Sequence, residues 1–259
     1  MTERAVTHVL LDFFGTLVSY SPSQTEQGYA RSHALAWSWG AQTDYCEFLQ
    51  AWAAEWGRFD DRSAIDLSEF SMTEISAAVL TRMLGGYPSA ARSAALASAY
   101  LREWNTGVSY PPGTVELVAG LASQYRLAVV TNTHQADLVP AHLAAMGIAR
   151  YIDAVITSVE VGWRKPHPAI YAAALRRLGV GPADAAFVGD TYEAEYGGPV
   201  AAGMTAFLID PGRRHDIPAQ HRLTSLADLP ARLRLHAVGG RNFNPTAPGP
   251  EPAGEAARS

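Results

Sequence analysis

The chain repeats one pattern that limits what it can fold into: short apolar runs stop abruptly at polar or small residues, and helix-length stretches separate them. The first run, 7–11, ends at Asp12-Phe13-Phe14-Gly15-Thr16. Later runs occupy 127–130, 154–156, 186–188 and 206–209. Short, continuously apolar runs of this kind are typical of strands buried on both faces. Their alternation with helices predicts an α/β protein with a doubly wound parallel sheet.

Residues 19–110 depart from this pattern. They contain no clear strand, but several Ala-rich and Trp-rich stretches with helical spacing and five of the six tryptophans. Pro111-Pro112-Gly113 marks the return to alternating strands and helices. We therefore expect an all-helical cap at 19–110, inserted after the first strand of a core formed by 1–18 and 111–236. The Gly-rich and Pro-rich end, 237–259, has little to bury and is predicted to be a disordered tail.

Composition excludes several classes of protein. The 259 residues carry a net charge of −5, whereas a nucleic-acid partner needs concentrated positive charge. No apolar run approaches the roughly 18 residues of a membrane span. A single cysteine, Cys46, allows no internal disulfide and favours a reducing compartment. We expect a cytoplasmic protein that binds a small molecule and neither nucleic acid nor membrane; the sequence does not choose between a monomer and a homodimer.

Lysine usage singles out one residue. Of the 20 basic residues 19 are arginine, so Lys165 is the only lysine of the chain. Abundant arginine and alanine are typical of a GC-rich coding bias, under which most lysine positions change to arginine. A lysine persists where a compact ammonium group is needed, because a guanidinium is planar, forked and differently hydrated. Lys165 is therefore a candidate functional residue.

Polar side chains follow several of the apolar runs. In a parallel sheet the carboxyl ends of the strands meet at one edge, which is where ligands bind. Three carboxylates in one cleft would repel one another and raise their pKa values, and a divalent cation removes that conflict. Oxygen ligands at this density favour Mg²⁺. The residues concerned are Asp12, Thr131, Asn132, Lys165, Asp190 and Glu195.

These segments, in this order and with a helical insert after the first, resemble the haloacid dehalogenase superfamily with a type-1 cap. The resemblance covers roughly residues 7–210. It implies a Rossmann-like core and hydrolysis of a phosphate ester through an aspartyl-phosphate intermediate. Under this resemblance Asp12 is the nucleophile, and Lys165 and Thr131 complete the catalytic set.

The resemblance also implies how substrate and metal would be held. The phosphoryl oxygens would be bound by Thr131, Asn132, Lys165 and the loop that contains Phe13 and Thr16. The ligands of Mg²⁺ would be Asp12, the backbone carbonyl of Phe14, and Asp190. Glu195, where the family usually has Asp, would support a metal-bound water or Lys165.

Phe14 departs from the family pattern. Family phosphatases usually carry a second Asp two residues after the nucleophile, which protonates the leaving group and later activates water. General acid–base catalysis of this kind is worth about 10²–10⁴ in rate, and phenylalanine cannot supply it. His134, His33 or Arg31 could take over this role, or a good leaving group could need no acid.

Three interpretations follow from this departure. The first is a Mg²⁺-dependent phosphatase of a small organic phosphate. The second is a 2-haloacid dehalogenase, which uses no metal and whose halide departs without a proton; Asp190 opposes it, because that branch has Ser and Asn in this segment. The third is a family member of low activity that binds a phosphorylated metabolite, which the retention of Asp12 and Lys165 opposes.

Overall fold

The computed structural model describes residues 6–21 and 27–242. Its centre is a six-stranded sheet in the order β5-β4-β1-β6-β7-β8, and every pairing in it is parallel. The strands are β1 (His8–Leu11), β4 (Arg126–Thr131), β5 (Ala154–Thr157), β6 (Ala185–Gly189), β7 (Thr205–Ile209) and β8 (Arg222–Leu223). Five of them occupy the apolar runs of the sequence; β8, which is only two residues long, had no such signal.

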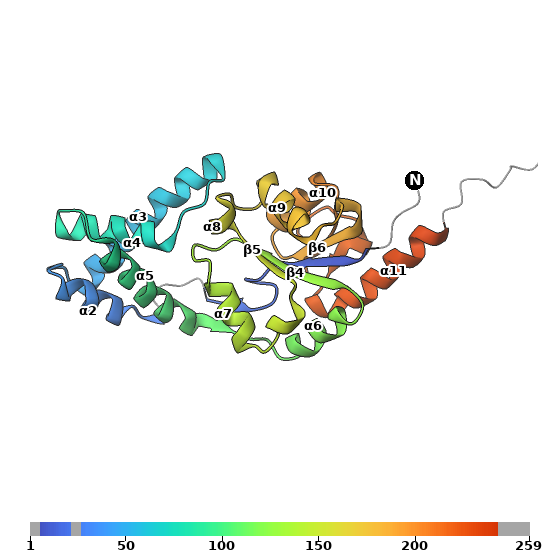
Figure 1. The fold of residues 1–259 in the computed structure, drawn as a ribbon, viewed down its shortest axis with the longest axis horizontal. Helices are drawn as coiled ribbons and strands as arrows, with labels where there is room; N and C mark the ends of the chain where they lie inside the picture. Colours follow the sequence, from blue (N-terminus) through green and yellow to red (C-terminus); the bar gives the residue numbers. More distant parts are fainter. Residues whose placement is uncertain (1–5, 22–26, 243–259) are drawn as a thin grey trace, which may run out of the picture.

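Successive residues of the central strands enter opposite faces of the sheet. Val9 and Leu11 join one apolar cluster and Leu10 joins another, and all three are fully buried. The first cluster is covered by α6 (Thr114–Ala122), α7 (Leu138–Ala145) and α11 (Leu229–Asn242). The second is covered chiefly by α9 (Pro168–Leu178), with α8 (Ser158–Val161) and α10 (Gly198–Ala201) near it. Helices on both faces confirm the predicted α/β class with a doubly wound, Rossmann-like sheet (Figure 1).

Two segments at the end of the core differ from the sequence-based expectation. Residues 194–202 read as one helix, but the chain forms a π-helical turn, η4 (Tyr192–Gly197), before α10. Helix α11 continues through Asn242, past the residue 236 at which the core was expected to end. The remainder of the expected tail, 243–259, lies outside the described residues.

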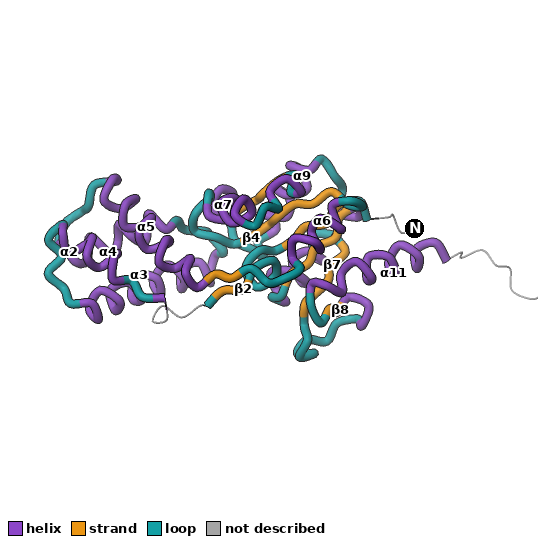
Figure 2. Tube along the Cα trace, turned by 90° about the horizontal axis from the view of Figure 1, so that it is seen from below, coloured by secondary structure: helices purple, strands orange, loops and turns teal. Residues whose placement is uncertain are grey.

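Four helices form a separate apolar cluster beside the sheet. They are α2 (Ala30–Ser38), α3 (Tyr45–Asp66), α4 (Met72–Leu84) and α5 (Ala90–Trp104). Stacked rings at its centre join α3, α5 and the residue that precedes α2: the ring centroids of Trp52 and Tyr100 lie 3.6 Å apart, and those of Tyr100 and Tyr29 lie 4.2 Å apart. Capping boxes begin α3 and α4, so each start is fixed by local hydrogen bonds. Figures 1 and 2 show these helices together at one end of the molecule. We call this unit the cap.

A pair of very short strands joins the cap to the core. β2 (Ser19–Tyr20) pairs antiparallel with β3 (Val108–Ser109). Ser19 lies opposite Ser109, and Tyr20 lies opposite Val108. The sequence of residues 19–110 predicts no strand, and this prediction was wrong. Two residues are too few to show a periodic pattern, and the pairing becomes visible only when both ends of the cap meet (Figure 2). The pair fixes the direction of Tyr20 at the entrance of the cap.

No helix in the described part of the chain is both long enough and apolar enough to cross a membrane.

Candidate active site

A cavity of about 620 Å³ lies where the carboxyl edge of the sheet faces the cap. The core contributes the polar part of its lining, which includes Asp12, Thr131, Lys165 and Glu195. The cap contributes apolar and aromatic side chains, namely Trp56, Met72, Tyr100, Leu101 and Trp104. A small polar group and a larger apolar group can therefore occupy the cavity side by side.

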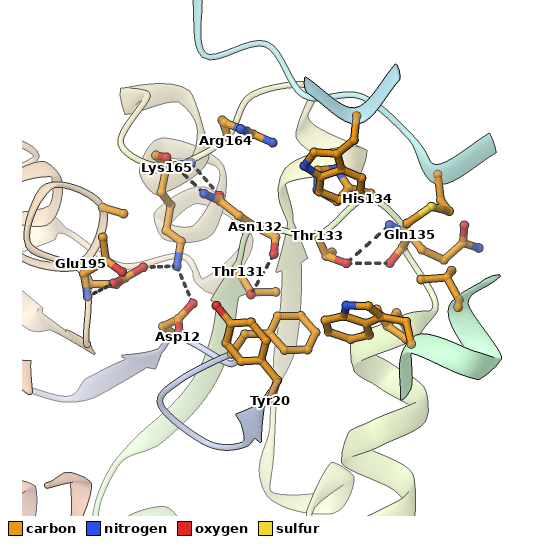
Figure 3. Close-up of a pocket in the computed structure, with 18 of the residues that line it drawn as sticks. Asp12, Tyr20, Thr131, Asn132, Thr133, His134, Gln135, Arg164, Lys165 and Glu195 are labelled. Atoms are coloured by element: carbon orange, nitrogen blue, oxygen red, sulfur yellow. Dashed lines mark hydrogen bonds and ion pairs between the residues drawn. The ribbon is translucent and has the colours of Figure 1, made fainter. Parts of the chain in front are cut away.

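Lys165 joins two of the predicted carboxylates at the polar end. Its Nζ atom lies 2.7 Å from Asp12 Oδ1 and 3.0 Å from Glu195 Oε1, and it also donates to the carbonyl oxygen of Val130 at 2.9 Å. All three donors of the ammonium group are thus used, and Figure 3 shows the contacts to Asp12 and Glu195. Asp12 and Lys165 are 4% and 3% exposed, so water screens this pair only weakly.

Burial and charge oppose each other in this cluster. Burial alone would lower the pKa of Lys165, but the charges of Asp12 and Glu195 outweigh it and raise that pKa. For Glu195 burial dominates and the charge of Asp12 adds to it, so that its pKa rises to about 7 despite the nearby ammonium. One cation is shared between two acids, and Glu195 is the acid that is pushed toward its neutral form.

Asn132 holds the backbone of Lys165. Its Oδ1 atom accepts a hydrogen bond from the Lys165 backbone N–H at 2.7 Å, and its Nδ2 atom donates to the Lys165 carbonyl at 3.2 Å. Asn132 also lines the cavity, as was predicted for a group that binds phosphoryl oxygens. Its side chain is therefore partly committed to positioning the lysine.

The loop after β1 presents Asp12 to the cavity. The hydroxyl of Thr16 donates to Asp12 Oδ2 at 3.1 Å, which leaves Oδ1 to the lysine. The side chain of Phe13 is fully buried in the core, so this residue can contribute only backbone groups to the site. The Thr131 hydroxyl, which lies at the end of β4, contacts the Asn132 carbonyl at 3.4 Å.

Asp190 and Gly15 form the best candidate for a metal position. Gly15 has φ +90°, and a Cβ atom there would lie 2.2 Å from Asp190 Oδ2, so only glycine lets this carboxylate approach the loop after Asp12. Burial raises the pKa of Asp190, and the charge of Asp12 raises it further. The carboxylates of Asp12 and Asp190, together with the backbone carbonyl of Phe14, would supply hard oxygen donors of the kind that suit Mg²⁺.

A second glycine makes room for Glu195. A Cβ atom at Gly189, the last residue of β6, would lie 2.2 Å from Glu195 Cγ. The Thr191 backbone N–H donates to the other carboxylate oxygen of Glu195. The space at Gly189 and the hydrogen bond from Thr191 thus allow the Glu195 carboxylate to reach Lys165. Within the described residues no three His, Cys, Asp or Glu side chains are grouped to hold a metal; Mg²⁺ often uses only one or two carboxylates together with water.

Aromatic side chains stand beside the acids. The Phe14 ring lies 5.5 Å from that of Trp104 and 5.7 Å from that of Tyr20, in edge-to-face contacts. Tyr20 also lies 6.1 Å from Trp104, so the three rings form one wall between core and cap. In Figure 3 the hydroxyl of Tyr20 points toward Asp12. Burial raises the pKa of this hydroxyl, and the negative charges of Asp190, Asp12 and Glu195 add to the effect.

The residues considered as replacements for the missing acid do not all reach the cavity. His33 and Arg31 lie on α2, and neither belongs to the described residues that line the cavity. His33 instead contacts the Thr43 carbonyl with Nε2 at 2.7 Å. His134 does line the cavity, but its Nδ1 atom lies 3.1 Å from both Glu69 Oε1 and the Phe70 carbonyl.

Glu69, like Tyr20, is a residue near the cavity that the sequence did not indicate. It lies in the loop between α3 and α4, its side chain is 1% exposed, and its contacts are with the core. Arg164 Nη2 lies 3.2 Å from Oε1, and the Ser158 hydroxyl donates to Oε2 at 2.6 Å. Burial would raise the pKa of Glu69, but its hydrogen-bonded partners and their positive charges lower it to about 2. One acid of the cap therefore contacts both the core segment that follows β4 and the core segment that follows β5.

The fold and the site together define a class of enzyme, in which a Rossmann-like sheet carries an acid–lysine cluster at its carboxyl edge beneath a helical cap. The chain belongs to the haloacid dehalogenase-like hydrolase family, whose model matches residues 6–203. This confirms the resemblance that the sequence segments indicated.

Individual relatives agree with this assignment. Haloacid dehalogenase-like hydrolase domain-containing protein 3 of Homo sapiens is 41% identical over 110 residues, 40% of this chain and 43% of that protein. The match thus spans less than half of that relative's length. Ribulose-1,5-bisphosphate 5-phosphatase of Halopiger xanaduensis is 29% identical over 213 residues, 81% of this chain and 87% of that protein. The solved 2-haloacid dehalogenase of Pseudomonas syringae pv. Tomato DC3000 has a TM-score of 0.64 at 22% identity and covers 89% of this chain and 99% of its own; this likeness concerns the fold alone.

Proposed function

We propose that this hydrolase is a Mg²⁺-dependent phosphatase of a small organic phosphate and that Asp12 forms an aspartyl-phosphate intermediate. The observation that carries the proposal is the environment of Asp12. Its carboxylate is buried, held by Lys165 at 2.7 Å and Thr16 at 3.1 Å, and it opens onto a cavity large enough for an organic substituent. The match to a named phosphatase over most of the chain supports this choice.

The first chemical step is attack of a carboxylate oxygen of Asp12 on phosphorus. The new O–P bond forms as the bond to the leaving group breaks, and the electron pair stays on the leaving oxygen. Lys165, which contacts Asp12, and Thr131, which lines the same cavity, would hold the negative phosphoryl oxygens. In the second step water attacks phosphorus, the O–P bond breaks, and Asp12 returns as a carboxylate with release of phosphate.

Asp12, Asp190 and the Phe14 carbonyl would hold the Mg²⁺ ion. When bound, this ion offsets the negative charge of the phosphoryl group and of the two carboxylates. Lys165 keeps Asp12 oriented throughout, and Glu195 supports the lysine from the opposite side at 3.0 Å. We assign this activity to the cytoplasm on the basis of the single cysteine of the chain.

One observation favours a second candidate, 2-haloacid dehalogenation. Phe14 offers no proton, and a departing halide needs none. Asp190 opposes this candidate, because without a cation the buried carboxylates would repel a carboxylate substrate. The pKa of Asp190 is raised first by burial and further by the charge of Asp12.

The test is a trapping experiment with acetyl phosphate, whose leaving group needs no acid. We expect mass spectrometry to find one phosphoryl group on Asp12 in the presence of Mg²⁺ and none in Asp12→Asn. EDTA should abolish hydrolysis and Mg²⁺ should restore it. Chloride release from 2-chloropropionate in the presence of EDTA would instead establish the dehalogenase. Binding of phosphorylated compounds without turnover of either substrate would identify a member of low activity.

A further inference from the structure

The cavity contains a hydroxyl group to which the phosphatase chemistry above assigns no role. Tyr20 lies on β2, directly where the cap begins, and its ring contacts that of Phe14 edge-to-face at 5.7 Å and lies tilted against that of Trp104 at 6.1 Å. Its hydroxyl points into the cavity toward Asp12 (Figure 3). Among the described residues none exchanges a hydrogen bond with this hydroxyl, whereas the amide of Asn132 and the ammonium of Lys165 are both engaged.

The position of this hydroxyl relative to residue 14 suggests a use. In family phosphatases the residue two places after the nucleophile delivers a proton to the leaving group, and here that residue is Phe14. The Tyr20 ring is in edge contact with the Phe14 ring, so the hydroxyl enters the cavity beside the place that an acid at position 14 would reach. The wall that lacks an acid therefore still carries one O–H donor.

We propose that the Tyr20 hydroxyl donates a hydrogen bond to the leaving-group oxygen while the bond between that oxygen and phosphorus breaks. This inference rests on the proposed phosphatase function and names a further catalytic residue for it. Tyr20 keeps its proton throughout. The electron pair of the broken bond remains on the leaving oxygen, Tyr20 stabilises the charge that develops there, and water supplies the proton after departure.

Two other donors that line the cavity, Tyr100 and His134, are less suited to this role. Tyr100 lines the cavity, but its ring is stacked between those of Trp52 at 3.6 Å and Tyr29 at 4.2 Å. His134 turns Nδ1 toward Glu69, and its ring is stacked on Phe70 at 4.4 Å. Tyr20 combines a hydroxyl that has no hydrogen-bond partner among the described residues, ring contacts to Phe14 and Trp104, and a direction toward the nucleophile.

The experiment compares Tyr20→Phe with the unchanged chain on phosphates whose leaving groups differ in basicity. Suitable substrates are acetyl phosphate, p-nitrophenyl phosphate, phenyl phosphate and glycerol 1-phosphate. The quantity to compare is kcat/KM, because it reports formation of the aspartyl phosphate, whereas dephosphorylation is common to all substrates. We expect Tyr20→Phe to lose about 10- to 100-fold on phenyl and glycerol phosphates and less than about 3-fold on the first two substrates.

Tyr110→Phe is the matched control. It removes the same hydroxyl group from a tyrosine that follows β3, where Tyr110 contacts His142 at 2.8 Å and is not among the described residues of the cavity. We expect its dependence on the leaving group to equal that of the unchanged chain. A Tyr20→Phe loss that is uniform over all four substrates, or no loss, would overturn the role of Tyr20 and leave the phosphatase intact. Absence of phosphoryl-Asp12 from acetyl phosphate in the unchanged chain would overturn both.

Discussion

A single ammonium group organises the polar end of the site. Lys165 gives one hydrogen bond each to Asp12, Val130 and Glu195, at 2.7 to 3.0 Å. Three donors that diverge from one nitrogen suit three acceptors around one point, whereas the donors of a guanidinium lie in one plane. In a chain with 19 arginines this geometry explains why a lysine stands here.

Phe14 leads to a prediction at the residue scale. Without a proton donor at this position, aryl phosphates should be hydrolysed much faster than alkyl phosphates, because phenolate leaves more readily than alkoxide. Phe14→Asp should narrow the ratio of kcat/KM for phenyl phosphate over glycerol 1-phosphate by about tenfold or more. Phe14→Asn is the matched control, since it has the same size and no proton to give; it should leave the ratio wide. An unchanged ratio in Phe14→Asp would contradict this account of the position.

The sequence predicts some of these residues and not others for a physical reason. Asp12, Lys165 and Asp190 follow strands of one parallel sheet, so the topology alone brings them to the same edge. Tyr20 and Glu69 belong to the cap side, and their roles depend on contacts with distant parts of the chain. Tyr20 is directed by its pairing with Val108, and Glu69 is buried only because a loop docks on the core. In the sequence, Glu69 is indistinguishable from any solvent-exposed acid.

At the scale of elements, the loop between α3 and α4 fastens the cap to the core. The Glu69 backbone N–H donates to the Gly162 carbonyl, and the Met72 N–H donates to the His134 carbonyl. The buried Glu69 carboxylate adds contacts to Ser158 and Arg164. This loop therefore contacts the segments that follow β4 and β5, close to the residues that place Lys165.

Glu69 gives a prediction about stability and pH. Its pKa falls from an ordinary 4.5 to about 2, so the unfolded chain binds the proton more readily than the folded chain. The carboxylate therefore stabilises the fold fully above pH 4.5, and this contribution is lost as pH falls toward 2. We expect Glu69→Gln to reduce the free energy of unfolding by about 3 kcal/mol at pH 7, with the difference from the unchanged chain shrinking in acid. Thermal unfolding across this pH range measures both effects.

Asp60→Asn provides the control for this prediction. Asp60 pairs with the same Arg164 at 2.9 Å, but its side chain is 54% exposed. An exposed pair of this kind is worth about 0–1 kcal/mol, so its loss should hardly change the unfolding temperature at any pH. Equal destabilisation by the two variants would show that the charge of Arg164, and not the burial of Glu69, controls the docking of the loop.

For the whole molecule, the division of labour follows the topology. The parallel sheet fixes the charged groups at its carboxyl edge, and the cap supplies the apolar wall opposite them. The fold brings the carboxylates of Asp12 and Asp190 together, and both burial and the charge of Asp12 raise the pKa of Asp190. A cation that binds to Asp12 and Asp190 would relieve the repulsion between these carboxylates and so stabilise the folded chain.

This reasoning predicts how the whole molecule responds to Mg²⁺. At a concentration of about 100 times Kd, Mg²⁺ should stabilise the fold by about 2.7 kcal/mol and raise Tm by about 5–10 °C. Because protonation of Asp190 competes with the ion, the shift should grow as pH rises. Asp190→Asn removes a repelled acid, so in EDTA its Tm should equal or exceed that of the unchanged chain, and Mg²⁺ should then have no effect.

The variant Asp210→Asn is the control: it tests whether removing any buried acid near the carboxyl edge of the sheet has the same effect as Asp190→Asn. It follows β7 at the same edge and is also buried, but the backbone N–H groups of Arg214 and His215, together with Arg222, overcome its burial and lower its pKa. Asp210→Asn should therefore lower Tm in EDTA and still show the full Mg²⁺ shift. Two variants of the same chemical type would then change stability in opposite directions, and only the one beside Asp12 would lose the response to the ion. If Asp190→Asn kept the Mg²⁺ shift, the ion would bind elsewhere, and Asp12 and Asp190 would repel each other without it.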